Sequence, residues 1–120
     1  MKKIALLVVA SATLLTGCLK DPGTIVYVKT KNTAGVYTNT FAVGDTIFAE
    51  AAIADQAFEQ ISWYVSSDNA APITLISYDN TNAIYIATGT GTGNVHLKIE
   101  NCNKNSKCRQ EYSDVAVTIQ

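Results

Sequence analysis

The chain has 120 residues, of which 48 % are hydrophobic and 16 % are charged, with a formal net charge of −1. This length suits a single domain, and the hydrophobic content is enough to form its core. There is no excess of basic residues, which argues against a nucleic-acid-binding protein.

The first segment, MKKIALLVVASATLLTGC, has the pattern of a secretory signal peptide. Lys2 and Lys3 form a positive n-region. The apolar run at residues 4–15 is shorter than the about 20 residues that a transmembrane helix needs. The segment ends in LTGC (15–18), which resembles the lipobox of bacterial lipoproteins. The alternative is an ordinary signal peptide that contains a cysteine by chance.

The lipobox resemblance implies that residues 1–17 are cleaved and that Cys18 carries a covalent diacylglycerol and an acyl chain such as palmitate. Buried acyl chains contribute about 0.8 kcal/mol per CH₂, so two or three chains hold a protein on a membrane. By resemblance to enteric lipoproteins, a residue other than Asp after the cysteine, here Leu19, implies the outer membrane over the inner membrane. We therefore expect a lipid-anchored protein of the cell envelope that faces the periplasm or the cell surface. Loss of Lys2 and Lys3 leaves seven basic against ten acidic residues, a net charge of about −3.

Residues 18–23, the lipidated cysteine followed by LKDPG, are expected to form a short tether. Residues 24–120 then consist of segments that alternate apolar and polar side chains, separated by Gly, Asn, Asp and Pro turns. This pattern predicts an all-β domain, an immunoglobulin-like antiparallel sandwich of about seven strands. Strands are expected at 24–29, 43–53, 60–67, 72–77, 83–88, 93–100 and 112–120. The segment 49–60 is rich in Ala and Glu, but we predict a strand followed by a loop there rather than a helix.

Three stretches, FAVGDTIFAEAAI, ISWYVSSDNA and IATGTGTGNVHLKI, resemble the bacterial Ig-like domains over about residues 24–120. That family has a Val-Gly-Asp/Glu approach to a core strand, a Trp strand followed by Ser-Ser-Asp/Asn, and a Gly-rich turn before a strand. The resemblance implies a sandwich used for adhesion, binding or spacing, without a catalytic site. The segment ENCNKNSKCRQE (100–111) departs from the family pattern.

Cys102 and Cys108 lie between the last two expected strands and are predicted to form a disulfide bond. Facing residues of an antiparallel pair are about 4.5–5.5 Å apart between Cα atoms, within disulfide range, and a secreted chain meets an oxidising compartment. A zinc site would need further ligands at a suitable spacing, and a redox pair would normally be CxxC. The single histidine, His96, supplies no second ligand pair.

The same hairpin carries Lys104, Lys107 and Arg109, three of the seven basic residues after cleavage. They are either routine charges of a solvated turn or contacts to the membrane or to a partner held there. In an immunoglobulin-like sandwich the chain starts at the end where this hairpin lies, and the membrane interpretation depends on that topology. Phe58, in the neighbouring loop, is expected to be a core side chain or an exposed contact residue.

The remaining patterns do not indicate catalysis. TGTGTGN (88–94) lacks the Lys-Ser/Thr of a phosphate-binding loop and is interpreted as a turn. Trp63 is expected in the core and His96 on the surface. No arrangement of Ser, His and Asp suggests a triad, and no acidic spacing suggests a calcium loop. We expect no enzyme activity, no metal and no cofactor apart from the lipid.

The sequence thus predicts a membrane-anchored lipoprotein whose Ig-like domain is a non-catalytic binding, adhesion or structural module. The expected partner, besides the membrane, is a protein or a cell-surface glycan. Two alternatives remain open: a small inhibitor of an attacking hydrolase such as lysozyme, and a lipoprotein that masks an outer-membrane receptor, as phage exclusion proteins do.

Overall fold

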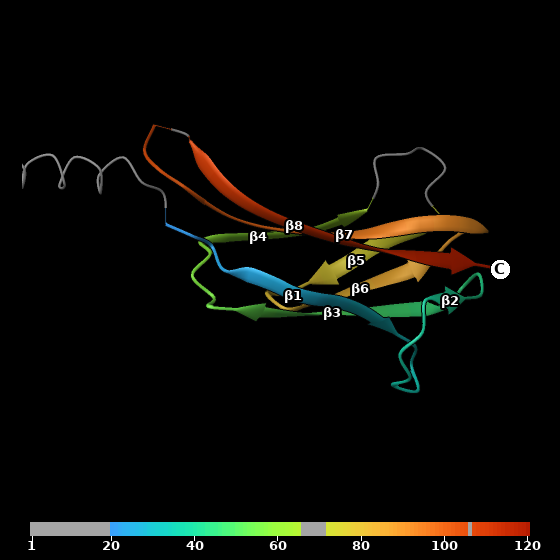
Figure 1. Ribbon diagram of the computed structural model, residues 1–120. Helices are drawn as coiled ribbons and strands as arrows, with labels where there is room; N and C mark the ends of the chain where they lie inside the picture. Colours follow the sequence, from blue (N-terminus) through green and yellow to red (C-terminus); the bar gives the residue numbers. More distant parts are fainter. Residues whose placement is uncertain (1–19, 66–71, 106) are drawn as a thin grey trace, which may run out of the picture.

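The computed structural model describes residues 20–65, 72–105 and 107–120, which form two four-stranded β-sheets packed face to face (Figure 1). The all-β prediction is confirmed. The expected signal peptide, Cys18 and the end of the predicted strand at 60–67 lie outside the described residues. The strands are β1 (Thr24–Lys31), β2 (Thr40–Phe41), β3 (Thr46–Ala54), β4 (Gln60–Val65), β5 (Ile73–Tyr78), β6 (Asn82–Ala87), β7 (Gly91–Cys102) and β8 (Cys108–Ile119).

The strand order is that of an immunoglobulin-like sandwich. One sheet has the order β1-β3-β6-β5 and the other β2-β8-β7-β4, which correspond to the ABED and GFC sheets of that fold. All neighbours are antiparallel except β2, which runs parallel to β8 through the pairs Thr40↔Thr118 and Phe41↔Ile119. About seven strands were expected, and β2 is the additional one. Its two residues are too few to show an alternating pattern.

The core lies between the two sheets and is built by the alternation in the strands. Trp63 on β4 is 2 % exposed, as expected, and its indole N–H donates to the Asp79 carbonyl at 3.2 Å. Tyr85 is fully buried, and its hydroxyl donates to the Tyr64 carbonyl at 3.1 Å, which satisfies its polar end. Burial raises the pKa of Tyr85. The buried hydrophobic set is Phe41, Ile47, Ala49, Ile53, Trp63, Ile73, Ala83, Tyr85, Ala87, Val95, Leu97, Ile99, Val117 and Ile119.

Two local predictions are settled by the strand bounds. The segment 49–60 is indeed a strand, which ends at Ala54, followed by a loop. The Gly-rich segment 88–94 is a turn only at residues 88–90, because β7 already begins at Gly91. Gly91 and Gly93 pair with Ile119 and Val117 on β8. A side chain at Gly93 would lie 3.1 Å from the ring of Pro72, so a glycine there lets the two segments pack closely.

The sandwich has two distinct ends (Figure 1). The β7–β8 hairpin extends past β4, and the described chain begins beside it. We call this the hairpin end, which comprises residues 20–23, the β3–β4 loop at 55–59 and the turn residues 103–105 and 107. The opposite end carries the 42–45 turn and the C-terminus, close to β2. The described residues contain no helix long and apolar enough to cross a membrane.

Candidate functional site

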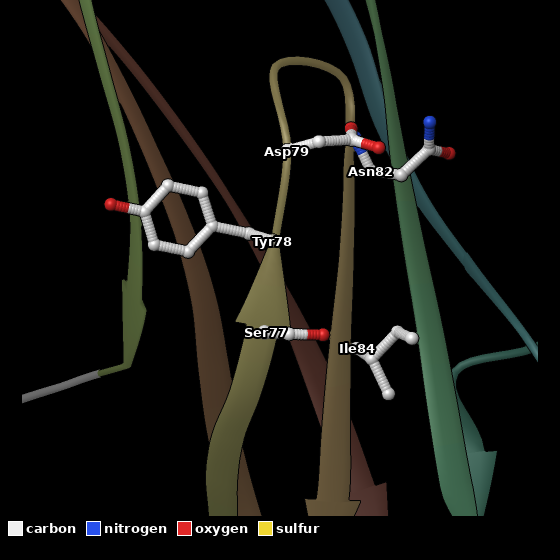
Figure 2. A pocket seen from close by; sticks show the side chains of 5 residues that line it. All are labelled: Ser77, Tyr78, Asp79, Asn82 and Ile84. Carbon is white, nitrogen blue, oxygen red and sulfur yellow. The ribbon is translucent and has the colours of Figure 1, made fainter.

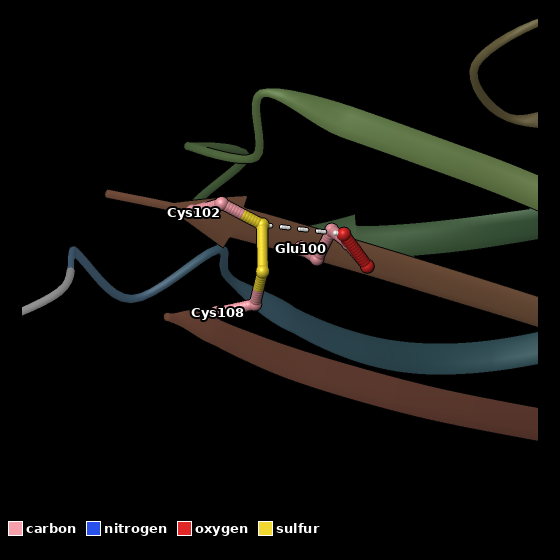
Figure 3. A group of neighbouring side chains, drawn as sticks. All are labelled: Glu100, Cys102 and Cys108. Atoms are coloured by element: carbon pink, nitrogen blue, oxygen red, sulfur yellow. Dashed lines mark hydrogen bonds between the residues drawn. A yellow bond between two sulfur atoms is a disulfide. The ribbon is translucent and has the colours of Figure 1, made fainter. Parts of the chain in front are cut away.

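The β7–β8 hairpin is closed by the predicted disulfide bond between Cys102 and Cys108 (Figure 3). The two cysteines are register partners at the last rung of the ladder, with Cα atoms 4.0 Å apart. The Glu100 carboxylate lies 3.4 Å from Cys102 Sγ, which brings three potential metal ligands together. Because the sulfur atoms are bonded to each other, neither is a thiolate that could bind a metal ion. The group is therefore a structural clip.

Beyond the disulfide, the side chain of Asn103 shapes the turn. Its Oδ1 accepts the backbone N–H groups of Asn105 at 2.9 Å and Lys107 at 3.0 Å. The backbone N–H of Asn103 donates to the Lys107 carbonyl at 2.8 Å. Lys104, Lys107 and Arg109 are all exposed on this turn and at the start of β8. The structure thus places the three predicted cations on one hairpin, at its turn and at the start of β8, where they are exposed to solvent.

Asn101 joins three segments at the hairpin end. Asn101 is only 2 % exposed. Its side-chain amide N–H groups donate to the carbonyls of Lys20 and Ala57, both at 3.0 Å. Its Oδ1 accepts the backbone N–H of Glu59 at 2.6 Å. The backbone N–H of Ala57 also donates to the Pro22 carbonyl at 3.3 Å. The start of the described chain is therefore held to both the β3–β4 loop and β7.

Gly23 allows the first residues to lie against the sandwich. Its φ of 112° belongs to a region that side chains disfavour, and a Cβ there would lie 2.8 Å from the carbonyl oxygens of Ala54 and Asp55. Its N–H donates to Asp21 Oδ1 at 3.0 Å, and Pro22 is buried. Part of the expected tether is consequently docked on the domain, and only Cys18 and Leu19 of that segment precede the docked residues.

Two further side chains complete the hairpin end. Arg109 lies 3.8 Å from Asp21, and both groups are more than half exposed, so this ion pair contributes little to stability. Phe58 is half-buried and packs against the hydrophobic core. Of the two roles predicted for Phe58, the core role is the one its position supports, and we remove it from the candidate contact surface.

Glu100 departs from the alternation predicted for β7. Strict alternation along the predicted strand at 93–100 would put it on the outer surface with His96, but it is 8 % exposed, because neighbouring side chains cover it on that face. Lys98 Nζ lies 3.0 Å from its carboxylate, and Gln110 Nε2 donates to it at 3.1 Å. These contacts, that of Lys98 first, lower the pKa of Glu100 against the opposing effect of burial. A period-two sequence pattern does not show when side chains of neighbouring residues cover an outward-facing residue.

A second polar cluster lies on the outer face of β1 and β3 and was not anticipated. Glu50 accepts a hydrogen bond from the Tyr37 hydroxyl at 2.6 Å, and Lys31 Nζ lies 2.9 Å from the same carboxylate. Lys29 Nζ lies over the Tyr27 ring, 4.4 Å from its centroid. The hydrogen bonds from Tyr37 and Lys31 lower the pKa of Glu50. The pairing of β1 with β3 brings these residues together, which no local sequence spacing could show.

The outer face of β4, β7 and β8 carries a third group. His96 stacks on Tyr64, with ring centroids 5.0 Å apart, and its Nδ1 lies 3.3 Å from Asp114. His96 is half-buried rather than fully exposed, because these neighbours on both adjoining strands flank it. Tyr112 is exposed, and its hydroxyl donates to Gln110 at 2.6 Å.

A pocket at the β5–β6 turn contains no reactive arrangement (Figure 2). The Asp79 carboxylate accepts the backbone N–H groups of Thr81 and Asn82, at 3.1 and 2.9 Å, and so serves to fix the turn. Ser77 and Ile84 point to the outer side of the sheet, whereas Tyr78 points away from them (Figure 2). The lining is that of an ordinary hairpin turn.

The fold and these sites together define an immunoglobulin-like β-sandwich with a disulfide-clipped hairpin beside the start of the chain. No protein-family model, no curated protein and no solved structure matches the chain. The resemblance to bacterial Ig-like domains therefore stays a prediction from the sequence pattern.

Proposed function

We propose that this chain is a lipid-anchored protein of the bacterial envelope whose sandwich is a non-catalytic binding module. The observation that supports it most is the docking of residues 20–23 at the hairpin end through Asn101. The expected lipid on Cys18 precedes the docked Lys20 by two residues, which span about 7 Å when extended. Lipidation would therefore bring the hairpin end to the bilayer surface.

The charge of the hairpin tip suits this orientation. Lys104, Lys107 and Arg109 are exposed within about one hairpin turn, and residues 101–110 contain no acidic side chain. A cation near an anionic lipid surface contributes about 1 kcal/mol of binding free energy. The hairpin would thus act as a second, electrostatic contact beside the lipid, and the two sheets and the opposite end would face outward for partners.

This orientation also weighs on the alternatives. A hydrolase inhibitor would have to insert a protruding element into a soluble enzyme, and the clipped hairpin, which extends past β4, is a candidate for that element. Because the hairpin lies beside the start of the chain, a lipid on Cys18 would turn its tip toward the membrane. A receptor-masking role is compatible with the same anchored orientation, since the sandwich would then stand beside other proteins of that membrane.

Metabolic labelling with radioactive palmitate tests the lipid anchor. We expect the wild-type chain to incorporate label, and Cys18→Ser to lose the label and to accumulate as the longer precursor. The double substitution Cys102→Ser and Cys108→Ser is the matched control, because it removes the other two cysteines and should leave labelling intact. A wild-type chain that is cleaved without acquiring label would contradict the proposal.

A further inference from the structure

The edge of β8 that faces away from β7 is open over most of its length. β2 pairs with β8 only at Thr118 and Ile119. No other strand of the described ranges pairs with β8 on that side, although β8 itself continues back to Cys108. Among the described residues, the stretch from Arg109 to Val117 therefore has a hydrogen-bonded strand on one side only.

Three observations show which backbone groups point to this open edge. The close Cα approach of Cys102 and Cys108 marks a rung without mutual backbone hydrogen bonds, so Cys108 directs its groups away from β7. Further along, the N–H of Thr118 donates to the Asn39 carbonyl at 2.8 Å, on the β2 side. The register between the two positions has no shift. Alternation then directs the N–H and C=O groups of four residues outward: Gln110, Tyr112, Asp114 and Ala116.

The other long edges of the sandwich are interrupted. A bulge lies between Ile25 and Tyr27 on β1, and another lies between Leu75 and Ser77 on β5. Bulges twist an edge and make it a poor template for another strand. The edge strand β4 is regular but has only six residues. Among the described strands, β8 thus presents the longest regular edge.

A shallow groove runs along the middle of this edge. It is lined by β1 (Val28, Lys29 and Thr30), the segment 37–39 and Val115 of β8. β1 lies close to β8 here, on the opposite sheet (Figure 1). Val28 and Val115 are only partly buried against the core, so they could still bury apolar area. β2 occupies the far end of the same line, where an extended segment pairs with Thr118 and Ile119 of β8.

We propose that the open edge of β8 binds an extended peptide of a partner protein, which adds to the sheet as a strand in line with β2. In such strand addition, main-chain hydrogen bonds provide affinity, and pockets for alternate side chains provide specificity. The partner segment would carry β-branched apolar residues at every second position, facing Val28 and Val115. The inference names the partner surface of the binding module proposed above and rests on that function.

A second copy of this chain fits the edge less well. Antiparallel pairing of two β8 edges would make the two strands run in opposite directions, which would place the two hairpin ends at opposite sides of the pair (Figure 1). Two copies anchored in one membrane have their hairpin ends on the same side. The proposed occupant is therefore a segment of another protein.

The test uses the full mature protein in detergent micelles and one synthetic probe, a capped nonapeptide that alternates valine with threonine and has a glutamate at each end. Amide hydrogen exchange by NMR should show protection of Gln110, Tyr112, Asp114 and Ala116 when the peptide is added. Asp114→Pro removes an outward N–H and should weaken peptide binding by about tenfold or more. Asp114→Ala keeps the N–H and is the matched control, expected to stay within about threefold of wild type.

The hydrogen-exchange measurement uses the wild-type chain, so it still tests the inference if the Asp114→Pro variant does not fold. Absence of protection at the four amides at millimolar peptide would overturn the inference. If those amides become protected when the concentration of the protein alone is raised, the edge mediates self-association and the inference is overturned. Equal binding to Asp114→Pro and wild type would place the peptide elsewhere. None of these results depends on palmitate labelling, so failure of this inference is distinct from failure of the lipid anchor.

Discussion

The side-chain amide of Asn101 donates a hydrogen bond to the backbone carbonyl of Lys20 at 3.0 Å, across 81 positions of sequence. This contact connects the first described residues to the base of the disulfide-clipped hairpin. Because Cys18 lies two positions before Lys20, the contact also relates the expected lipid to the orientation of the whole sandwich. A buried asparagine thus couples the stability of the domain to the way in which it would stand on a membrane.

Asn101→Ala should destabilise the domain by about 2–4 kcal/mol. The substitution removes three hydrogen bonds of a buried side chain and leaves the Lys20 and Ala57 carbonyls without this donor, whereas the Glu59 N–H keeps its bond to the Glu100 carbonyl at 3.2 Å. Denaturant unfolding of the variant and the wild type measures the difference. Asn105→Ala is the control at an exposed turn position and should change stability by less than about 0.5 kcal/mol. Equal stability of the Asn101 variant and the wild type would contradict the clamp.

Removal of the disulfide should cost about 2 kcal/mol. Cys102 and Cys108 are separated by six positions, and the chain-entropy model gives only a modest closure effect for so small a loop. We expect Cys102→Ser with Cys108→Ser to remain folded, with a lower midpoint of thermal unfolding. A loss of the fold on reduction would show that the hairpin clip has a larger role than this geometry supports.

The Glu50 cluster should make stability depend on pH in the acid range. The pKa of Glu50 is lowered from 4.5 in the folded chain, chiefly by the Tyr37 hydrogen bond and then by Lys31. The stabilisation that ionised Glu50 provides is therefore fully present above pH 4.5, and it is lost as the pH falls through the lower pKa of the folded chain. The stability difference between wild type and Glu50→Gln should shrink on acidification from pH 7, as followed by chemical unfolding. In the Tyr37→Phe background, the stability difference between Glu50 and Glu50→Gln proteins should be smaller. A stability difference that does not change with pH would contradict the account.

The hairpin cations should promote adsorption of the unlipidated domain to anionic vesicles. At about 1 kcal/mol each, replacing Lys104, Lys107 and Arg109 by Gln should lower the partition coefficient on the order of a hundredfold. Sedimentation with phosphatidylglycerol vesicles at low salt measures this effect. The charge-matched control replaces three lysines outside the hairpin tip, Lys29, Lys31 and Lys98. Equal losses in both triple variants would show that overall charge, not the hairpin, controls adsorption.

Much of the sandwich could be predicted from the sequence because its strands alternate sharply. Val95, Leu97 and Ile99 are alternate residues of the strand predicted at 93–100 and are all buried, and Trp63 lies in the core as predicted. The pairing of Cys102 with Cys108 followed from their place at a hairpin. These features depend on residues that are close together in the sequence, at most six positions apart, which a linear pattern contains.

The contacts that shape the candidate sites were not predictable in the same way. Asn101 has partners near both the start and the middle of the chain, and Glu50 gathers Tyr37 and Lys31 across paired strands. Phe58 was ambiguous because a loop residue carries no periodic signal. The two-residue strand β2, which leaves most of the β8 edge open, is too short to be recognised by alternation.

The account depends most on the orientation of the hairpin end toward the membrane. The direct measurement places a fluorescent non-natural side chain at Asn105, on the hairpin turn, or at Val43, at the opposite end, in the full lipidated protein on vesicles that contain nitroxide-labelled headgroups. We expect strong quenching at Asn105 and little at Val43. Equal quenching at both positions, or stronger quenching at Val43, would contradict the proposed orientation.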